Sequence, residues 1–447
     1  MSSYKVMKTP GDTEWFMHDR FGMFIHFGTY SLTGRHEWTK KIELTSEEKY
    51  QKYFKYFNPD LFDAREWARK AKEAGMKYAV LTTKHHEGFC LFETKYTDYK
   101  ITNTPFGRDL VKEYVEAFRA EGLKVGFYYS LIDWHHPDFP IDVNHPRRFD
   151  DNVIELDKNR DMTKYAEYMR NQITELLTNY GKIDILWFDF TYNPPFNAFP
   201  DVLPNVMPWM RFGGGKGPSE WEAHKMIALV RKLQPHIIIN DRIGIKQDII
   251  TPEQVVRNTW PTDPETGECI VWEACHTFSG AWGYSRDEMT WKTPKMLISI
   301  LEKTVALGGN VIMNVGPTGR GCFDERACHA LDEFSKWMKY NSRSIYGCTM
   351  AEPEFKAPAG TVLTQSEDGK RLYIHIIDYP SQNIEMENLA GKVDYAQFLH
   401  DGSEVFAYEG NTVIAGIPRT VEKGYVSFGI PLVAPNMINP VIEVFLK

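Results

Sequence analysis

The 447-residue sequence is poor in cysteine, and its cysteines are not spaced for metal binding or dense cross-linking. Six are scattered along the chain, and no two of them form a C-x-x-C pair. Zinc knuckles and small disulfide frameworks need close, regular cysteine spacings, so both classes are excluded. We therefore expect free thiols in a reducing compartment.

The chain also lacks long apolar runs and an excess of positive charge. No window reaches about eighteen consecutive apolar residues, and the first ten residues contain no apolar core of a signal peptide. The formal net charge of −8 provides no basic field for phosphate backbones. We expect a cytoplasmic protein that spans no membrane and binds no nucleic acid.

Short apolar runs alternate with helical patterns over the first three quarters of the chain. The runs predict strands at 21–27, 78–83, 125–129, 183–188, 236–239, 270–272 and 310–315. Helical patterns with typical start and stop signals lie between them, as at 64–74, 109–121, 161–180 and 219–233. This α/β alternation predicts a parallel sheet. Seven units within 1–345 favour a (β/α)8-like TIM barrel as the catalytic domain, with an open doubly wound sheet as the alternative.

The sequence changes character in residues 346–447. Short alternating runs, separated by Gly, Asp and Asn turns, occur at 361–364, 371–376, 412–415 and 441–445. They predict a C-terminal antiparallel β-sandwich domain. A different, irregular segment at 193–218 is rich in proline and aromatic residues and follows the fourth predicted strand. Long irregular loops of this kind are usually functional or disordered.

The most informative stretch is the fourth predicted strand, which ends with Trp187 and Asp189. A single aspartate at a strand end is about as often a cap of the next turn as it is a functional carboxylate. In a parallel barrel, however, residues at the carboxyl ends of the strands converge on one site. Most of the other predicted strands also end in polar or aromatic residues, namely His26, His85-His86-Glu87, Tyr128, Asn240-Asp241-Arg242 and Trp272-Glu273.

Three interpretations of His26, His85 and His86 are open: ligands of sugar hydroxyls, metal ligands of a barrel hydrolase, or structural residues. A metal hydrolase typically has an H-x-H pair on one strand. The adjacent His85 and His86 would point to opposite faces, so at most one would face the barrel mouth unless the strand ends there. The adjacent histidine pair therefore favours the sugar-binding interpretation over the metal-ligand one. Two carboxylates with histidines, an arginine and aromatic planes suit glycoside hydrolysis.

Six sequence blocks carry a resemblance to a known family. They are 21–28 (FGMFIHFG), 84–89 (KHHEGF), 126–130 (GFYYS), 186–189 (LWFD), 240–242 (NDR) and 308–317 (GGNVIMNVGP). In this order they resemble the α-L-fucosidases of glycoside hydrolase family 29, over about residues 14–348. The resemblance implies a barrel with a C-terminal β-sandwich and exo-acting, retaining hydrolysis of terminal α-L-fucose by double displacement. It also implies that no metal or other cofactor takes part.

The resemblance implies that Asp189 is the nucleophile, because it matches the aspartate of the family's L-W-x-D block. Glu253, in the segment 248–253 (DIITPE), resembles the general acid/base of the family's D-x-x-T-x-E segment and is the favoured candidate. Glu273 and the pair Asp287 and Glu288 are the alternatives. Glu273 ends a predicted strand, where an ion-pair partner of a binding residue would also lie. The pair lies in a polar loop.

The same matching implies the residues that hold the sugar: His26, Glu37, Trp38, His85, His86, Tyr128, Trp187 and Arg242, with Trp282 offering a plane to the C6 methyl group. The partner would be a fucosylated oligosaccharide or glycoside. The 193–218 segment is longer than the family pattern, which leaves the aglycone preference open. Assembly into a homo-oligomer is a separate open point. Two other classes compete: a non-catalytic carbohydrate-binding barrel, and a metal-dependent barrel hydrolase that chelation would inactivate.

Overall fold

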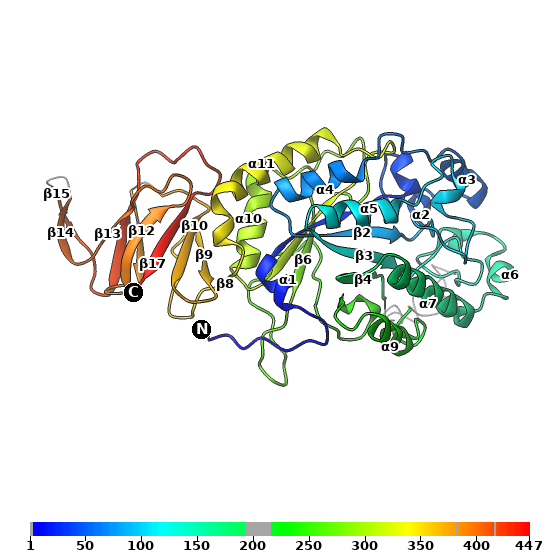
Figure 1. Cartoon of the computed structure of the whole chain (residues 1–447), viewed down its shortest axis with the longest axis horizontal. Helices are drawn as coiled ribbons and strands as arrows, with labels where there is room; N and C mark the ends of the chain where they lie inside the picture. The colour runs from blue at the N-terminus through cyan, green and yellow to red at the C-terminus, as the bar shows by residue number, and fades with distance from the viewer. Residues whose placement is uncertain (1–2, 193–215, 381, 415–416) are drawn as a thin grey trace.

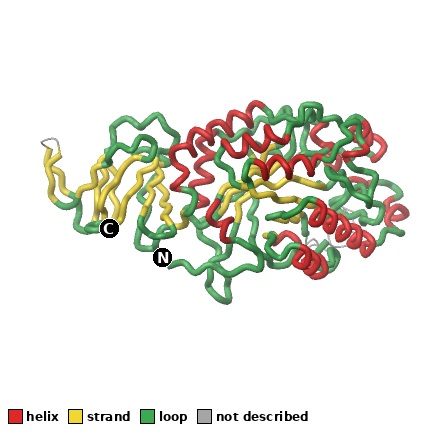
Figure 2. Tube along the Cα trace, in the orientation of Figure 1, coloured by secondary structure: helices red, strands yellow, loops and turns green. Residues whose placement is uncertain are grey.

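The computed structural model describes residues 3–192, 216–380, 382–414 and 417–447. They form a barrel surrounded by helices and a second body of antiparallel strands (Figure 1). Figure 2 shows the helices of the first body on the outside of its strands. Most of the irregular segment predicted at 193–218 lies outside the described residues.

Seven parallel strands form the barrel sheet, in the order β5-β4-β3-β2-β1-β7-β6. Their bounds are β1 Phe21–Ile25, β2 Tyr78–Lys84, β3 Lys124–Ser130, β4 Ile185–Asp189, β5 Ile238–Ile239, β6 Glu273–Thr277 and β7 Asn310–Val315. Almost every residue in them is buried, as expected for parallel strands covered on both faces. The prediction at 270–272 was wrong in position, because β6 begins at Glu273.

An irregular segment at 248–254 closes the barrel between β5 and β6. Ile249 makes a parallel bridge with Asn240, and Ile250 makes one with Trp272. Backbone hydrogen bonds continue along the segment, from the N–H of Cys275 to the carbonyl of Pro252 and from the N–H of Glu273 to the carbonyl of Ile250. The sheet is therefore a closed barrel and not the open alternative. We call residues 248–254 the closing segment.

Helices cover the barrel and begin at side-chain caps. The main ones are α4 Ala64–Glu73, α5 Leu110–Ala120, α7 Met162–Asn179, α9 Ala223–Leu233, α10 Pro294–Val305 and α11 Glu325–Asn341. Asp63, Asp109 and Asp161 each accept hydrogen bonds from backbone N–H groups of the first turn, which would otherwise be unpaired. The predicted start of α9 at Ser219 was wrong, because the preceding Glu222 has a left-handed backbone, with φ of 48°.

Shorter helices occupy the connections: α1 Glu14–Asp19, α2 Thr39–Ile42, α3 Glu47–Lys55 and α6 Val153–Asp157. The 3-10 helices are η1 Thr29–Leu32, η2 Ile101–Asn103, η3 Pro146–Phe149, η6 Asp241–Ile243 and η7 Ser342–Ser344. No helix in the described ranges is long and apolar enough to cross a membrane. All six cysteines are free thiols.

The C-terminal domain is built from antiparallel sheets. Its sheets have the orders β12-β17-β10-β9-β8, β11-β16-β13 and β14-β15. The strands are β8 Cys348–Met350, β9 Thr361–Ser366, β10 Arg371–Ile376, β11 Asn383–Glu387, β12 Val393–Phe398, β13 Phe406–Tyr408, β14 Asn411–Ile414, β15 Ile417–Thr420, β16 Tyr425–Gly429 and β17 Val441–Leu446. Ile374 and Val444 of the first sheet share one core with Ile384 and Phe428 of the second, which confirms the predicted sandwich.

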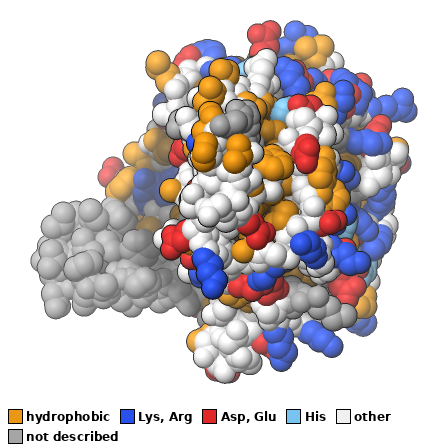
Figure 3. Space-filling view, turned by 90° about the vertical axis from the view of Figure 1, so that its left-hand side faces the viewer, with side chains coloured by type: hydrophobic (Ala, Val, Ile, Leu, Met, Phe, Trp, Pro, Cys, Tyr) orange, Lys and Arg blue, Asp and Glu red, His pale blue; other side chains and the backbone are white. Residues whose placement is uncertain are grey.

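Figure 3 views the molecule from the end that carries these sheets and shows hydrophobic side chains gathered between charged ones. Exposed apolar residues of this domain include Val413 and Ile417 on the β14–β15 hairpin, and Leu432 and Val433 after β16. The predicted domain boundary at 345/346 falls between η7 and β8.

A buried polar cluster joins the two domains. Glu302 of α10 lies 3.1 Å from Nδ1 of His375 on β10, and its second oxygen accepts a hydrogen bond of 2.5 Å from Asn439. Nε2 of His375 lies 2.9 Å from the hydroxyl of Thr364. Glu302 and His375 are fully buried, and burial raises the pKa of Glu302. A buried polar group without a partner is costly, so this cluster constrains how the domains meet.

We predict that Glu302→Ala lowers the free energy of unfolding by about 2 kcal/mol, because His375 and Asn439 lose their shared buried partner. Lys303→Ala, the exposed neighbour on the same helix, is the matched control and should change stability by less than about 0.5 kcal/mol. Urea unfolding followed by circular dichroism measures both. Equal effects of the two substitutions would contradict the structural role of Glu302.

Candidate functional site

A cavity of about 490 Å³ lies at the carboxyl ends of the barrel strands. The arrowheads of β2 and β3 point away from the C-terminal sheets (Figure 1), so the cavity opens at the far end of the barrel. Its lining residues are Phe24, His26, Trp38, His85, His86, Tyr128, Trp187, Asp189, Phe190, Thr191, Tyr192, Asp241, Arg242, Gly244, Thr251, Glu253 and Trp282.

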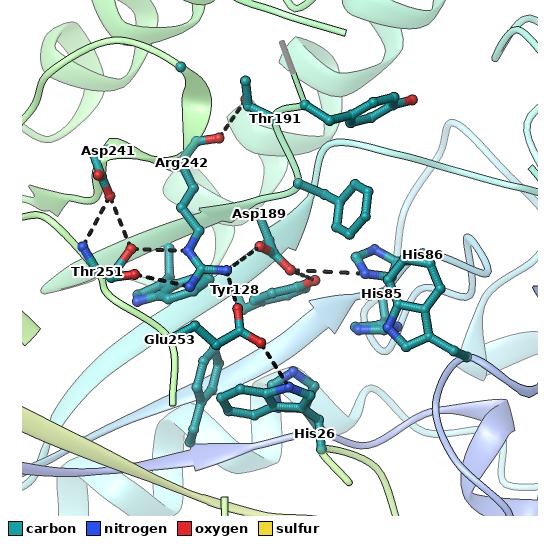
Figure 4. Close-up of a pocket in the computed structure, with 17 residues that line it drawn as sticks. His26, His85, His86, Tyr128, Asp189, Thr191, Asp241, Arg242, Thr251 and Glu253 are labelled. Atoms are coloured by element: carbon teal, nitrogen blue, oxygen red, sulfur yellow. Dashed lines mark hydrogen bonds and ion pairs between the residues drawn. The ribbon is translucent and has the colours of Figure 1, made fainter. Parts of the chain in front are cut away.

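Asp189 is the last residue of β4 and projects into the cavity (Figure 4). One carboxylate oxygen accepts a hydrogen bond of 2.8 Å from the hydroxyl of Tyr128, and the other accepts one of 2.9 Å from Nη1 of Arg242. Nε2 of His86 lies 4.0 Å from the first oxygen. The parallel register places Tyr128 beside Trp187 on the adjacent strand, so the positions of these side chains follow from the pairing of β3 with β4.

Arg242 follows β5 in η6 and connects two carboxylates. The same Nη1 atom lies 2.8 Å from Oε2 of Glu253 (Figure 4). The hydroxyl and carbonyl of Thr251 accept hydrogen bonds from Nε and Nη2, at 3.1 and 3.0 Å. The guanidinium also lies over the ring of Trp187, 4.5 Å from its centroid. The orientation of Arg242 is therefore fixed from several sides.

The charge of Arg242 is favoured by its surroundings. Burial opposes the charge, but the thiol of Cys275 together with Asp189 and Glu253 outweighs this and raises the pKa of Arg242 above its usual value. Because oxygens of Asp189 and Glu253 both contact one nitrogen, those two oxygens are separated by less than about 6 Å, an upper bound that is compatible with the spacing typical of retaining glycosidases.

Glu253 belongs to the closing segment and is the more exposed of the two carboxylates, with 43% of its side chain accessible against 13% for Asp189. Its other oxygen accepts a hydrogen bond of 3.2 Å from Nε1 of Trp282. A general acid must reach both the leaving group and water, and this position is open to each.

The alternative acid candidates lie outside the cavity. Glu273 is fully buried, where it accepts hydrogen bonds from the hydroxyl of Tyr78 at 2.5 Å and from Nε1 of Trp187 at 3.3 Å. Burial raises the pKa of Glu273 to about 7. Asp287 pairs with Arg286 at the surface, and Glu288 accepts hydrogen bonds from Thr290. Glu273 therefore supports the floor of the site through Trp187, and the other two have local partners.

The histidine pair lies beyond the end of a strand. Because β2 ends at Lys84, both His85 and His86 line the cavity, although adjacent strand residues would point to opposite faces. The ring of His85 is stacked on Tyr128, with centroids 5.6 Å apart, and Nδ1 of His86 is 2.7 Å from the hydroxyl of Ser130. The predicted strand at 78–83 ended one residue earlier, so the condition under which both histidines can face the cavity is met.

Burial favours the neutral form of two cavity histidines, His26 and His86. Burial lowers the pKa of His26 well below its ordinary value, and the neighbouring ring of His85 lowers it further. The pKa of His86 is also lowered well below the ordinary value by burial, and then by His85 and His26. A neutral imidazole has one donor and one acceptor nitrogen, which suits the hydroxyl groups of a sugar.

Glu37 is the predicted binding residue that does not line the cavity. It is buried, and Oε2 accepts hydrogen bonds from the backbone N–H groups of Trp282 and Gly283, at 3.2 and 2.8 Å. Nδ2 of Asn314 donates to the carbonyl of Trp282, while its Oδ1 lies 2.6 Å from Nδ1 of His26. Glu37 and Asn314 thus hold the loop that carries Trp282. Asn314 was part of a recognised block but was not among the predicted site residues.

Several further lining residues were not among the predicted catalytic or binding residues: Phe24, Phe190, Thr191, Tyr192, Asp241, Gly244 and Thr251, of which Asp241 had been expected at the site only as a strand-end residue. Thr251 donates to Asp241 and accepts from Arg242, so the spacing of the D-x-x-T-x-E segment could have indicated it. Phe190 to Tyr192 directly follow Asp189, and their position after a strand end was the available signal.

In the part of the chain that the structure describes, no group of three or more His, Cys, Asp or Glu side chains is arranged to hold a metal ion. The cavity combines two carboxylates, an arginine, histidines and aromatic planes. This set can bind a polyhydroxylated ring and carry out acid and nucleophilic catalysis on it.

Comparisons with known proteins agree with this chemistry. The family model described as Alpha-L-fucosidase matches residues 3–343. The solved α-L-fucosidase isoenzyme 1 from Paenibacillus thiaminolyticus is 41% identical, with a TM-score of 0.85, covering 97% of this chain and 98% of its own. A family 29 α-L-fucosidase structure from Bacteroides thetaiotaomicron is 27% identical with a TM-score of 0.79, covering 100% and 98%. The α-L-fucosidase of Dictyostelium discoideum is 26% identical over 463 residues, which cover 96% of this chain and 91% of that protein. The chain therefore belongs to the α-L-fucosidase family, glycoside hydrolase family 29.

Proposed function

We propose that this glycoside hydrolase is an exo-acting, retaining α-L-fucosidase with Asp189 as nucleophile and Glu253 as general acid/base. The observation that carries the proposal is the contact of both carboxylates with one nitrogen of Arg242 inside a single cavity. A non-catalytic carbohydrate-binding barrel would have no need for two carboxylates at this separation.

The close spacing of the carboxylates supports retention. Retaining enzymes hold the two groups about 5–5.5 Å apart, so that one can attack the sugar directly, whereas inverting enzymes leave roughly 6.5–9.5 Å for a water molecule. Another structure from Bacteroides thetaiotaomicron, 27% identical to this chain, is described as a trapped covalent intermediate formed with 2-fluoro-fucosyl fluoride. A covalent intermediate is the mark of double displacement.

In the proposed first step, an oxygen of Asp189 attacks C1 of the fucose and forms a C–O bond to it. The bond from C1 to the leaving oxygen breaks, and Glu253 transfers its proton to that oxygen. In the second step Glu253 removes a proton from water, the water oxygen attacks C1, and Asp189 is released. Arg242 and the hydroxyl of Tyr128 hold Asp189 in place for both steps.

The rest of the cavity suits a deoxy sugar. The neutral rings of His26 and His86 can donate to or accept from hydroxyl groups. Phe24, Trp187 and Trp282 form an apolar wall, with ring centroids of Phe24 5.1 Å from Trp187 and 6.0 Å from Trp282. A methyl group at C6 gains contact with such a wall, whereas a hydroxymethyl group would lose hydrogen bonds there.

We predict that Asp189→Ala lowers kcat for 4-nitrophenyl α-L-fucoside by at least about 1,000-fold, because the covalent step is lost. Added azide should restore part of the rate by taking the place of the carboxylate. Asp287→Ala removes an exposed carboxylate outside the cavity and is the matched control. A kcat close to that of the wild type for Asp189→Ala would show that the nucleophile is another residue.

We predict that α-L-fucose is the first product seen by proton NMR, before mutarotation, because two inversions at C1 give net retention. The measurement uses wild-type protein and 4-nitrophenyl α-L-fucoside at enzyme concentrations that complete hydrolysis within minutes. Initial formation of the β-anomer would indicate a single displacement and would exclude a covalent role for Asp189.

We predict that Glu253→Ala is far more damaging on a fucosyl-galactose disaccharide than on 4-nitrophenyl α-L-fucoside, because a phenolate departs with little protonation. The alkaline limb of the pH–rate profile should also flatten in this variant. The matched control is Glu273→Gln, which keeps hydrogen-bonding atoms under Trp187 and should affect the two substrates alike. If only Glu273→Gln discriminates between the leaving groups, the acid/base role belongs to Glu273.

A further inference from the structure

Phe190, the residue after Asp189, has an unusual backbone conformation. Its φ is 81°, in the region where glycine is favoured and bulky residues are rare. A strained backbone of this kind persists only where surrounding contacts enforce it, and it is found disproportionately at functional sites. The question is what the Phe190 side chain contributes that a glycine would not.

The chain on both sides of Phe190 is firmly anchored. The carbonyl of Asp189 accepts a hydrogen bond of 3.0 Å from the N–H of Leu131. The hydroxyl of Thr191 donates to the carbonyl of Arg242 at 2.6 Å and accepts from Nε1 of Trp221 at 3.0 Å. These bonds fix the path of the backbone and therefore the direction in which the Phe190 ring points.

The ring of Phe190 belongs to an aromatic group at the edge of the cavity. Its centroid lies 5.1 Å from Trp38, 4.9 Å from His86 and 5.4 Å from Tyr192. The hydroxyl of Tyr192 is hydrogen-bonded to the buried Asp142, which holds the outer ring in position. We call Trp38, Phe190 and Tyr192 the aromatic rim.

The aromatic rim lies further out than Tyr128, Trp187 and His86, and its exposure places Trp38, which the family resemblance implied as a ligand of the fucose, with this outer group. Tyr128, Trp187 and His86 are at most 2% exposed, whereas all three rim residues are only partly buried. The chain leaves the barrel at Asp189, and Phe190 and Tyr192 follow it beyond the end of β4. In an exo-acting enzyme the terminal sugar fills the inner part of the cavity, so the rim meets the leaving group.

We propose that the aromatic rim, with Phe190 at its centre, binds the leaving-group sugar of the substrate by stacking on the apolar face of its pyranose ring. The proposal rests on the exo-fucosidase function proposed above. Flat rings in a cavity that also has polar lining residues, here Thr191 and Asp241, are suited to a sugar that has one C–H face and hydroxyl groups at its edge. Phe190 keeps its strained backbone because only a side chain at this position provides the central ring.

Kinetics with three substrates test the rim. α-L-Fucosyl fluoride has no ring in its leaving group, 4-nitrophenyl α-L-fucoside has a ring that needs little protonation, and a fucosyl-galactose disaccharide has a pyranose ring. We predict that Phe190→Gly lowers kcat/KM for each ring-bearing substrate, relative to fucosyl fluoride, by about tenfold. Phe190→Tyr should restore both ratios. Phe406→Ala, which removes an exposed ring of the C-terminal domain, is the control.

Stability provides an independent readout of the strained backbone. Phe190→Ala and Phe190→Gly both remove the ring, but only glycine relaxes a φ of 81°. We therefore expect the Gly variant to have a higher Tm than the Ala variant, the reverse of the usual order. A lower Tm for the Gly variant would overturn the assignment of strain.

The outcomes separate the two proposals. Wild-type protein that is inactive on all three substrates would overturn the fucosidase function, and the rim with it. Active wild-type protein whose substrate ratios survive Phe190→Gly would overturn the rim alone. A loss confined to the disaccharide would indicate disturbed proton transfer from Glu253, and would also overturn the rim.

Discussion

The bridge that Arg242 makes between Asp189 and Glu253 is the interaction on which the site depends. Two carboxylates this close repel each other, and one partly buried cation between them offsets that repulsion. The guanidinium can do this because Thr251 and the face of Trp187 hold it in one orientation. Tyr128 and Trp282 each donate a hydrogen bond to one of the carboxylates, but only Arg242 contacts both and so links their positions directly.

This bridge also links catalysis to the closure of the barrel. Asp189 ends a regular strand, but Glu253 and Thr251 lie on the closing segment between β5 and β6. The backbone hydrogen bonds that complete the sheet are the same ones that place the acid/base candidate opposite the nucleophile candidate. Correct closure is therefore a condition for the site, and burial of the barrel interior provides the free energy for it.

The sequence allowed prediction of the elements whose patterns are local. Regular apolar runs gave β1 to β4 and β7, and aspartate caps marked the starts of α4, α5 and α7. The closing segment was not predicted as a strand, because it contains Pro252 and pairs through isolated bridges. The direction of the His86 side chain could not be predicted from the sequence either, because it depends on the turn after Lys84. The placement of Glu37 behind Trp282 depends on contacts between residues 245 positions apart.

Several residues next to the site have a strained backbone conformation. Eight non-glycine residues in the described ranges have positive φ, and three of them adjoin predicted site residues. His36 precedes Glu37, Phe190 follows Asp189, and Gln254 follows Glu253. Each of these three residues lies at a turn directly before or after a residue with a carboxylate side chain. Backbone strain is therefore found where the positions of side chains are most constrained. Strand β4 sets the depth of Asp189, whereas Glu37 and Glu253 lie in irregular segments whose strained turns help to set the direction of their side chains.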